Sequence, residues 1–325
     1  MNDKTPARAR LVSIDARHER QRIDNYLLAA LKGVPKSHIY RLLRTGQVRV
    51  NKGRIKPVYR LKAGDVVRIP PLRLEERTSP GAPGNHLIQR LQASFLYEDE
   101  DLIVLNKPSG MAVHGGSGIR RGVIEILRHC RPELDDIELV HRLDRETSGC
   151  LMISKRREVL LILQQHFKED HIRKQYLALL QGAWRGGART VDAPLCKKQR
   201  LSGERVVRVS PQGKAAETVF RPREVFAGAS LMEVDLRTGR MHQIRVHAAH
   251  MGRPIAGDQK YGDAGFNAVM KSRGLKRLFL HAACLEFFHP GLQEKMRVDA
   301  PLGNELEGVL SELRRSESVL PYEND

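Results

Sequence analysis

Residues 141–149 read His-Arg-Leu-Asp-Arg-Glu-Thr-Ser-Gly and stand between two short apolar runs. The apolar runs predict strands and the Thr-Ser-Gly end predicts a turn, so the charged residues belong to a tight loop. Charged loops that join buried strands often carry function, which makes Asp144 the candidate reacting group. Local chemistry alone also allows a simpler explanation, in which Asp144 caps the turn by accepting backbone N–H bonds from Thr147 or Ser148.

Length and charge limit the class of protein. With 325 residues the chain is long enough for about two domains and a sizeable core. Its formal net charge of +18 favours a polyanionic partner, and nucleic acid is the leading candidate. A membrane is the alternative polyanion, but no segment approaches the roughly 18 to 20 apolar residues of a membrane span. The N-terminus lacks the apolar segment of a secretory signal, so we expect a cytoplasmic protein.

Cysteine and histidine spacing argues against a metal site. The four cysteines lie far apart and form no C-x-x-C pair, so neither a zinc site nor a disulfide framework is indicated. The histidines show no ligand pair on one helical face, and we expect no metal. His141, His242 and His247 stand near arginines, where histidine more often orients a neighbour or binds phosphate than acts as a general base.

The basic character is concentrated at the front of the chain. The first 90 residues carry a net charge of +13, which leaves +5 for the remaining 235. Apolar residues at helical spacing predict two short helices, over 22–31 and after Ser37, and alternating apolar and basic residues over 48–69 predict a small sheet. The predicted RNA-binding cations of this unit are Lys36, Arg41, Arg44 and Arg49.

This helix–helix–sheet unit resembles the S4 RNA-binding domain, which has an α-L-like fold. The resemblance covers about residues 18–72 and rests on four segments, which are 22–27 (RIDNYL), 36–37 (KS), 46–51 (GQVRVN) and 61–65 (LKAGD). A Pro-Pro pair ends the unit, and a stretch rich in Pro, Gly and Ser follows it as a predicted linker. Beyond the linker, strand patterns outnumber helical ones, which predicts a sheet-rich α+β domain.

Five motifs in the second part of the chain are specific when they are taken together. In chain order they are 141–149 (HRLDRETSG), 174–179 (KQYLAL), 239–247 (GRMHQIRVH), 257–262 (GDQKYG) and 281–290 (HAACLEFFHP). With the S4-like unit in front of them, these motifs resemble the RluA-type pseudouridine synthases over about residues 18–310. Met241 departs from the pattern, because Thr or Ser is more usual before the His-Gln pair.

The resemblance implies a uridine isomerase that breaks the N1–C1′ bond, rotates the uracil and rejoins it through C5 without a cofactor. Asp144 would be the essential aspartate, either attacking C1′ or removing a proton from C2′. The sequence does not decide between these routes. The cation that favours the ionised carboxylate would be Arg245. Tyr176 would stack on the target base, although an ordinary strand aromatic has the same local pattern.

Three further residues receive roles from the same resemblance. Arg142 would enter the RNA stack after the uridine leaves it, which offsets part of the cost of base flipping. Arg240 would contact phosphate, and Leu280 would form the apolar floor of the pocket unless it serves core packing alone. The implied partner is 23S ribosomal RNA, free or in a large-subunit assembly intermediate. The resemblance also implies a mixed or antiparallel sheet in the catalytic domain, and we expect a monomer.

Other functions remain open at this level. The same fold could act on transfer RNA or on another ribosomal RNA site. A non-catalytic RNA-binding or ribosome-assembly factor would also carry the S4-like unit and the charge, although Asp144, Tyr176 and Arg245 together argue against it. A glycosidase needs two carboxylates beside the bond, and Glu146 is the nearest second acid.

The predicted domain organisation follows from these segments. We expect a disordered lead over 1–17, an S4 domain over 18–80, a linker over 81–93, a catalytic domain over 94–315 and a flexible tail over 316–325.

Overall fold

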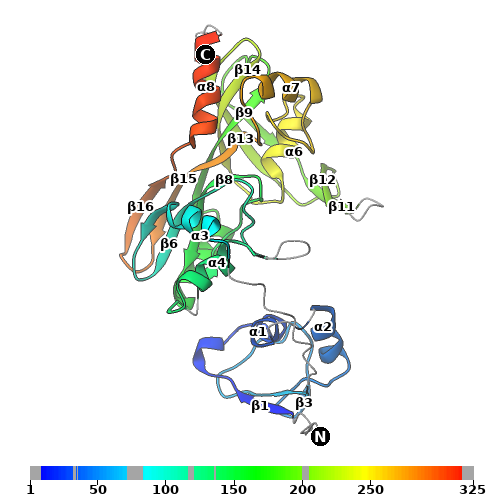
Figure 1. Cartoon of the computed structure of the whole chain (residues 1–325). Helices are drawn as coiled ribbons and strands as arrows, with labels where there is room; N and C mark the ends of the chain where they lie inside the picture. Colours follow the sequence, from blue (N-terminus) through cyan, green and yellow to red (C-terminus); the bar gives the residue numbers. More distant parts are fainter. Residues whose placement is uncertain are drawn as a thin grey trace, which may run out of the picture. The chain divides into compact units, whose positions relative to one another are not determined.

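The structure is a computed structural model that describes residues 9–31, 34, 36–71, 83–115, 121–134, 137–199 and 205–316. The chain divides into two compact units, Met1–Gly81 and Ala82–Asp325. Figure 1 colours the first unit blue and the second from cyan to red. The predicted α+β class, a small helix-and-sheet unit followed by a sheet-rich domain, is confirmed by this architecture. In the described part of the chain, no helix is long and apolar enough to cross a membrane.

The first unit packs two helices against a four-stranded sheet of order β1-β4-β2-β3. The helices are α1 (Ile23–Ala30) and α2 (Lys36–Arg44), and the strands are β1 (Arg10–Ser13), β2 (Arg49–Val50), β3 (Gly53–Arg54) and β4 (Val66–Ile69). The apolar residues that recur at helical spacing in α1 and α2 are buried in one core, which leaves the basic residues outside.

The lead predicted over 1–17 was wrong for its last part. Residues 10–13 form β1, which pairs antiparallel with β4, and a 3-10 turn η1 follows over Ala16–His18. The side chain of Ile14 is buried in the core of this unit. A four-residue strand with a polar residue at each end is too short for its alternation to be visible, and its stability comes from the partner strand.

The second unit is built on one ten-stranded sheet, whose central path runs β10-β13-β14-β9-β15-β8-β6-β5. Its strands are β5 (Phe95–Glu98), β6 (Leu102–Lys107), β7 (Glu138–Leu139), β8 (Ser148–Ser154), β9 (Arg173–Gln181), β10 (Arg189–Asp192), β13 (Glu217–Val225), β14 (Ala229–Leu236), β15 (Leu280–His289) and β16 (Glu294–Asp299). A separate hairpin, β11 (Leu195–Gln199) with β12 (Arg205–Val209), stands away from this sheet (Figure 1). The helices are α3 (Asn85–Gln92), α4 (Val123–Cys130), α5 (Arg157–Lys168), α6 (Gln243–His250), α7 (Ala264–Ser272) and α8 (Asn304–Ser316).

Helix α3 corrects the predicted linker over 81–93. Its residues 85–92 are helical, and Leu91 is buried against the core that also contains α4. The Gly and Pro residues before α3 made the whole stretch resemble a linker. The three apolar residues Leu87, Ile88 and Leu91 have the spacing of a helix face, which is the signal that the composition obscured.

The centre of the sheet joins two halves that have separate cores. One core lies around β5, β6, β8, α4 and α5, and the other around β9, β13, β14 and α6 to α8. Strand β8 pairs parallel with β15, whereas the other described pairings of this sheet are antiparallel. In this register Ala282 of β15 lies opposite Gly149 on one side and Tyr176 on the other. The start of β8 and the middle of β9 therefore lie on opposite sides of the same residue of β15.

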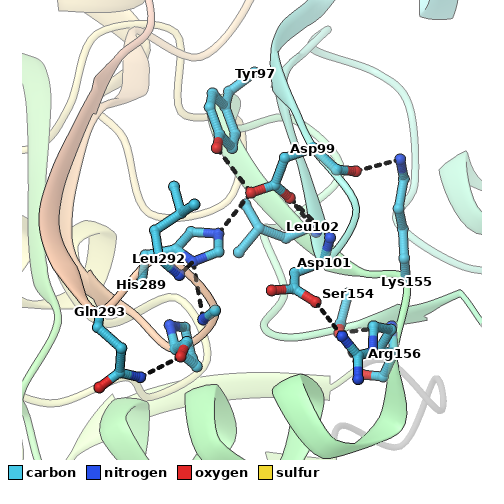
Figure 2. Close-up of polar contacts among 12 residues, drawn as sticks. Tyr97, Asp99, Asp101, Leu102, Ser154, Lys155, Arg156, His289, Leu292 and Gln293 are labelled. Carbon is cyan, nitrogen blue, oxygen red and sulfur yellow. Dashed lines mark hydrogen bonds and ion pairs between the residues drawn. The ribbon is translucent and has the colours of Figure 1, made fainter.

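A polar cluster fastens the far end of β15 to the β5–β6 turn. Figure 2 shows Tyr97 and His289 pointing toward the Asp99 carboxylate. The Tyr97 hydroxyl donates to Oδ2 of Asp99 at 2.8 Å, and Nε2 of the buried His289 lies 2.9 Å from the same oxygen. The other oxygen of Asp99 accepts the backbone N–H groups of Asp101 and Leu102. These contacts hold the β15–β16 turn in place at a distance from the candidate site.

We predict that Gly149→Ala is strongly destabilising. Gly149 has φ +107°, and a Cβ there would lie 2.1 Å from the backbone oxygen of Ala282. Overpacking against backbone costs about 1–3 kcal/mol in addition to the dihedral strain. Gly186→Ala is the matched control, because Gly186 has φ +76° but no atom within 4 Å of the added Cβ. Urea unfolding of both variants measures the difference, and an equal loss of stability in the two would contradict the prediction.

Candidate active site

A pocket of about 210 Å³ lies where the two halves of the sheet meet. It brings together residues that are far apart in the sequence, from the 141–149 loop, β9, the 237–242 loop, α6 and the start of β15. The predicted site residues that line it are Arg142, Asp144, Tyr176, Arg240, Arg245 and Leu280.

The loop that carries Asp144 is held in place by the last residue of β6 and by the turn that follows this strand. Lys107 is fully buried, and its ammonium donates to the carbonyl oxygens of Pro108 at 3.0 Å, Met111 at 2.9 Å and Arg145 at 3.2 Å. The backbone N–H of Gly110 also donates to the carbonyl of Arg145 at 2.9 Å. Burial lowers the pKa of Lys107 to about 7, whereas the nearby carboxylates oppose this shift. The loop is thus fixed through its backbone.

Asp144 does not cap its own turn through the side chain. Its backbone carbonyl accepts the N–H of Thr147 at 3.2 Å. The described contacts of its carboxylate lie across the pocket, where Oδ2 is 3.7 Å from Nε2 of His242 and 4.0 Å from Nη1 of Arg245. The side chain is 22% exposed. Both side chains are therefore near the carboxylate but beyond hydrogen-bond distance.

Arg245 is held firmly by a second acid. Its Nε and Nη2 each donate to one oxygen of Asp258 at 2.7 Å, and the guanidinium lies 5.1 Å from the centre of the Tyr261 ring. Burial opposes ionisation of Asp258, but the Arg245 guanidinium lowers its pKa below the ordinary value. Asp258 also accepts the backbone N–H groups of Lys260 and Tyr261. A bidentate, buried pair of this kind fixes the position of the guanidinium.

Tyr176 lies at the boundary between the two cores and packs against both. Burial, followed by the negative charge of Asp144, raises the pKa of its hydroxyl well above the ordinary value. Tyr176 is consequently a neutral phenol at pH 7, with its ring at the pocket wall.

The remaining predicted pocket residues have distinct surroundings. Leu280 is buried at the first position of β15 and forms an apolar part of the lining. Arg142 is exposed at the rim, and Arg240 is exposed with its Nε donating to the carbonyl of Ala215 at 3.1 Å. Arg145, in contrast, turns away from the pocket and donates to the carbonyl of Gly110. The carboxylate is thus not held between the two arginines of its own loop.

Of the three histidines singled out, two are structural. His141 accepts the backbone N–H of Met152 at 3.0 Å and stacks on Phe167, and His247 is buried between Thr218 and Ala193. His242 alone among the three lines the pocket.

The S4-like unit presents its predicted cations on one helix and one strand. Arg41 and Arg44 are exposed on α2 and line a groove of that unit together with Arg54 and Lys56. Arg49 is exposed on β2 and donates to the carbonyl of Gly46 at 3.1 Å. The side chain of Lys36, at the start of α2, lies outside the described residues.

Sequence reasoning missed four residues at or beneath the pocket. Lys197 of β11 lines it, and Lys107, Asp258 and Tyr261 support its members. Asp258 and Tyr261 belong to the motif at 257–262, so their place in that motif could have indicated that they lie near the site. Lys107 gave none, because a lysine at the end of a strand is usually exposed.

Two family models match this chain. A model described as RNA pseudouridylate synthase matches residues 101–250, and the S4 domain model matches residues 21–67. The first range includes the Asp144 loop, Tyr176 and Arg245, and the second includes α1, α2, β2, β3 and the start of β4.

Curated relatives resemble the chain over nearly its full length. A protein of Salmonella typhimurium named ribosomal large subunit pseudouridine synthase C is 52% identical over 319 residues, covering 97% of this chain and 100% of the relative. The protein of the same name from Pasteurella multocida is 51% identical over 310 residues, with 95% of each chain covered.

Among solved structures, human RNA pseudouridylate synthase domain containing 4 has a TM-score of 0.59 and 27% identity. The match covers 71% of this chain and 97% of that one.

We predict that Lys107→Met destabilises the second unit by about 1–3 kcal/mol, because three carbonyl groups lose a buried donor. The difference should also depend on pH. A folded-state pKa of about 7 is below the ordinary value of 10.5, so the unfolded wild type binds more protons and its stability rises as pH increases between these values. The advantage of wild type over the variant should therefore grow from pH 7 to pH 9, by at most about 1.4 kcal/mol per pH unit.

Urea unfolding at the two pH values measures this effect. Lys155→Met, which removes a lysine paired with Glu98 elsewhere in the same unit, controls for loss of a charge. If the difference in unfolding free energy between wild type and Lys107→Met stayed constant from pH 7 to pH 9, the lowered pKa of Lys107 would be contradicted.

Proposed function

Since this chain belongs to the RNA pseudouridylate synthase family, in its RluA-type branch with an S4 domain, we propose that it isomerises specific uridines of 23S ribosomal RNA. The enzyme class, an RNA pseudouridine synthase, follows from the family. The family predicted from the five motifs is thereby confirmed. The ribosomal substrate is the proposal, and it is supported by the names of relatives that match over nearly the whole chain.

The observation that carries the proposal is the position of Asp144 in the pocket. Its carboxylate is partly exposed, lies beside Arg245 and the His242 imidazole, and makes no bidentate pair of its own among the described contacts. An ionised carboxylate in this state can attack C1′ of a uridine or remove the C2′ proton, since either step needs a free oxygen lone pair. In both routes the N1–C1′ bond breaks and the uracil turns. C5 then bonds to C1′, either by displacing the Asp144 carboxylate or by adding to the C1′–C2′ double bond while Asp144 returns the proton to C2′, and C5 finally loses its own proton.

The pocket wall supports binding of one flipped base. We assign Tyr176 to stacking on the uracil, because its ring lies at the wall and its neutral hydroxyl is a poor base. Leu280 supplies an apolar contact from below. Arg142 at the rim is positioned to fill the gap left in the RNA stack, which reduces the few-kcal/mol cost of flipping.

The S4 domain and the rim of the pocket supply cations for the RNA backbone. We assign phosphate contacts to Arg41, Arg44 and Arg49 in the first unit and to Arg240 in the second. The pocket is completed by residues of one chain, which supports action as a monomer. We place this activity in the cytoplasm, on free RNA or on an assembly intermediate of the large subunit.

We predict that Asp144→Asn abolishes activity. Loss of a reacting carboxylate should lower the rate by about 10²–10⁴-fold while the fold is kept. Tritium release from C5-labelled uridine in large-subunit RNA measures the rate. Glu146→Gln is the matched control, because this acid is two residues away, exposed and paired with Arg145, and it should retain wild-type activity. Equal rates for Asp144→Asn and wild type would exclude the assignment of Asp144.

We also predict that RNA affinity depends on salt through the S4 domain. Replacing Arg41 and Arg44 with Gln should reduce the slope of log affinity against log salt by about 1.5, as expected for two phosphate contacts. Fluorescence anisotropy with labelled RNA measures the slope. The control replaces Arg314 and Arg315 with Gln, which removes the same charge from α8, where the two arginines pair with Glu224 and Glu312. An unchanged salt slope in the variant that lacks Arg41 and Arg44 would exclude these two arginines as phosphate contacts.

A further inference from the structure

The hydroxyl of Tyr261 joins the β11–β12 hairpin to the pocket. It accepts the backbone N–H of Val207 in β12 at 3.0 Å, and it lies 2.8 Å from Nδ1 of His242. The ring of Tyr261 packs in a small core with Val207 and with Val246 of α6. Tyr261 therefore touches the hairpin, the site helix and a pocket residue at once.

Either neutral tautomer of His242 can make the contact with Tyr261, because a phenolic oxygen both donates and accepts, and one of them points an N–H at the pocket. A backbone N–H can only donate, so the phenolic oxygen is the acceptor from Val207. In the tautomer that points an N–H at the pocket, the hydroxyl donates to an unprotonated Nδ1 of His242. The proton of the neutral imidazole then lies on Nε2. That nitrogen is the one 3.7 Å from Oδ2 of Asp144.

The charges around His242 favour the neutral ring. Burial lowers the pKa of His242 below its ordinary value. Asp144 across the pocket opposes this shift, as does the more distant Asp258. Arg245 of the same helix and Lys260 of the following loop reinforce it. Because Arg245 pairs with Asp258, the acid left facing the imidazole is Asp144.

The backbone at His242 supports a functional constraint. His242 has φ +54° at the N-cap of α6, a left-handed conformation that is uncommon for residues other than glycine. Such strain persists where the surroundings determine it and often lies at functional sites. Here it aims the imidazole between Tyr261 and Asp144.

We propose that Tyr261 is a positioning residue for the reaction, whose hydroxyl holds His242 as the Nε2–H tautomer so that an N–H faces the Asp144 carboxylate. This inference rests on the function proposed above for the pocket. Neutral His242 then directs an N–H toward Asp144 across 3.7 Å, which supplies a favourable dipole without transferring a proton to the carboxylate. Since the same hydroxyl accepts a hydrogen bond from β12, movement of the hairpin would change the position of the hydroxyl that contacts His242.

Tyr261→Phe tests the proposal, because it removes the hydroxyl and keeps the ring beneath Arg245. Tyr97→Phe is the matched control, since it removes one phenolic hydroxyl that donates to Asp99 in the same unit, away from the pocket (Figure 2). We expect kcat of Tyr261→Phe to fall about 10-fold, as is typical when a supporting hydrogen bond is lost, with KM within about twofold of wild type. Tyr97→Phe should keep both constants.

Nitrogen-15 NMR of labelled histidine reads the tautomer directly in the full chain without RNA. The His242 signals are assigned with His242→Gln, and wild type and Tyr97→Phe should both show the Nε2–H form at neutral pH. Tyr261→Phe should show a mixture of tautomers. A wild-type ring protonated on Nδ1 overturns the proposal even if Tyr261→Phe does not fold, and so does a Tyr261→Phe variant with wild-type tautomer and kcat. Failure of wild type to form pseudouridine would instead contradict the proposed function.

Discussion

The close approach of β8 to β15 at Gly149 is the contact on which the site depends. Gly149 and Ala282 are register partners in the parallel pair, and a Cβ on Gly149 would collide with the backbone of Ala282. Ala282 is also opposite Tyr176. The strand that begins just after Asp144 can therefore lie close to the strand that carries Tyr176, with β15 between them. A wider spacing at this point would separate the carboxylate from the rest of the pocket.

This contact joins two halves that each supply an incomplete site. The core around β6 and β8 positions Asp144, and the core around β9, β14 and α6 positions His242 and Arg245. Tyr176 packs against both cores. The pocket forms only when both cores and the sheet between them are in place, because its members come from positions between Arg142 and Leu280 of the chain. Local elements alone do not produce the site.

The sequence allowed prediction of those features that depend on local pattern or on several motifs together. Helices α1 and α2 follow from apolar periodicity, and the motifs singled out Asp144, Tyr176 and Arg245, which the fold brings to one pocket. Strand β1 was missed because its stability comes from β4, and the role of Lys107 was missed because it depends on the carbonyl of Arg145, which is 38 residues away. A partner that is distant in sequence leaves no periodic signal.

The buried charges explain why the carboxylate at the centre stays available. A guanidinium that formed a bidentate pair with Asp144 would occupy both oxygens and compete with the substrate. In this protein that pair is made with Asp258, and Arg245 approaches Asp144 only to 4.0 Å. Tyr261 occupies Nδ1 of His242 in the same way and leaves Nε2 toward the pocket. Each cationic or donating neighbour of Asp144 is thus held by another partner, so it supplies a favourable field and leaves an oxygen of the carboxylate available for the reaction that we propose.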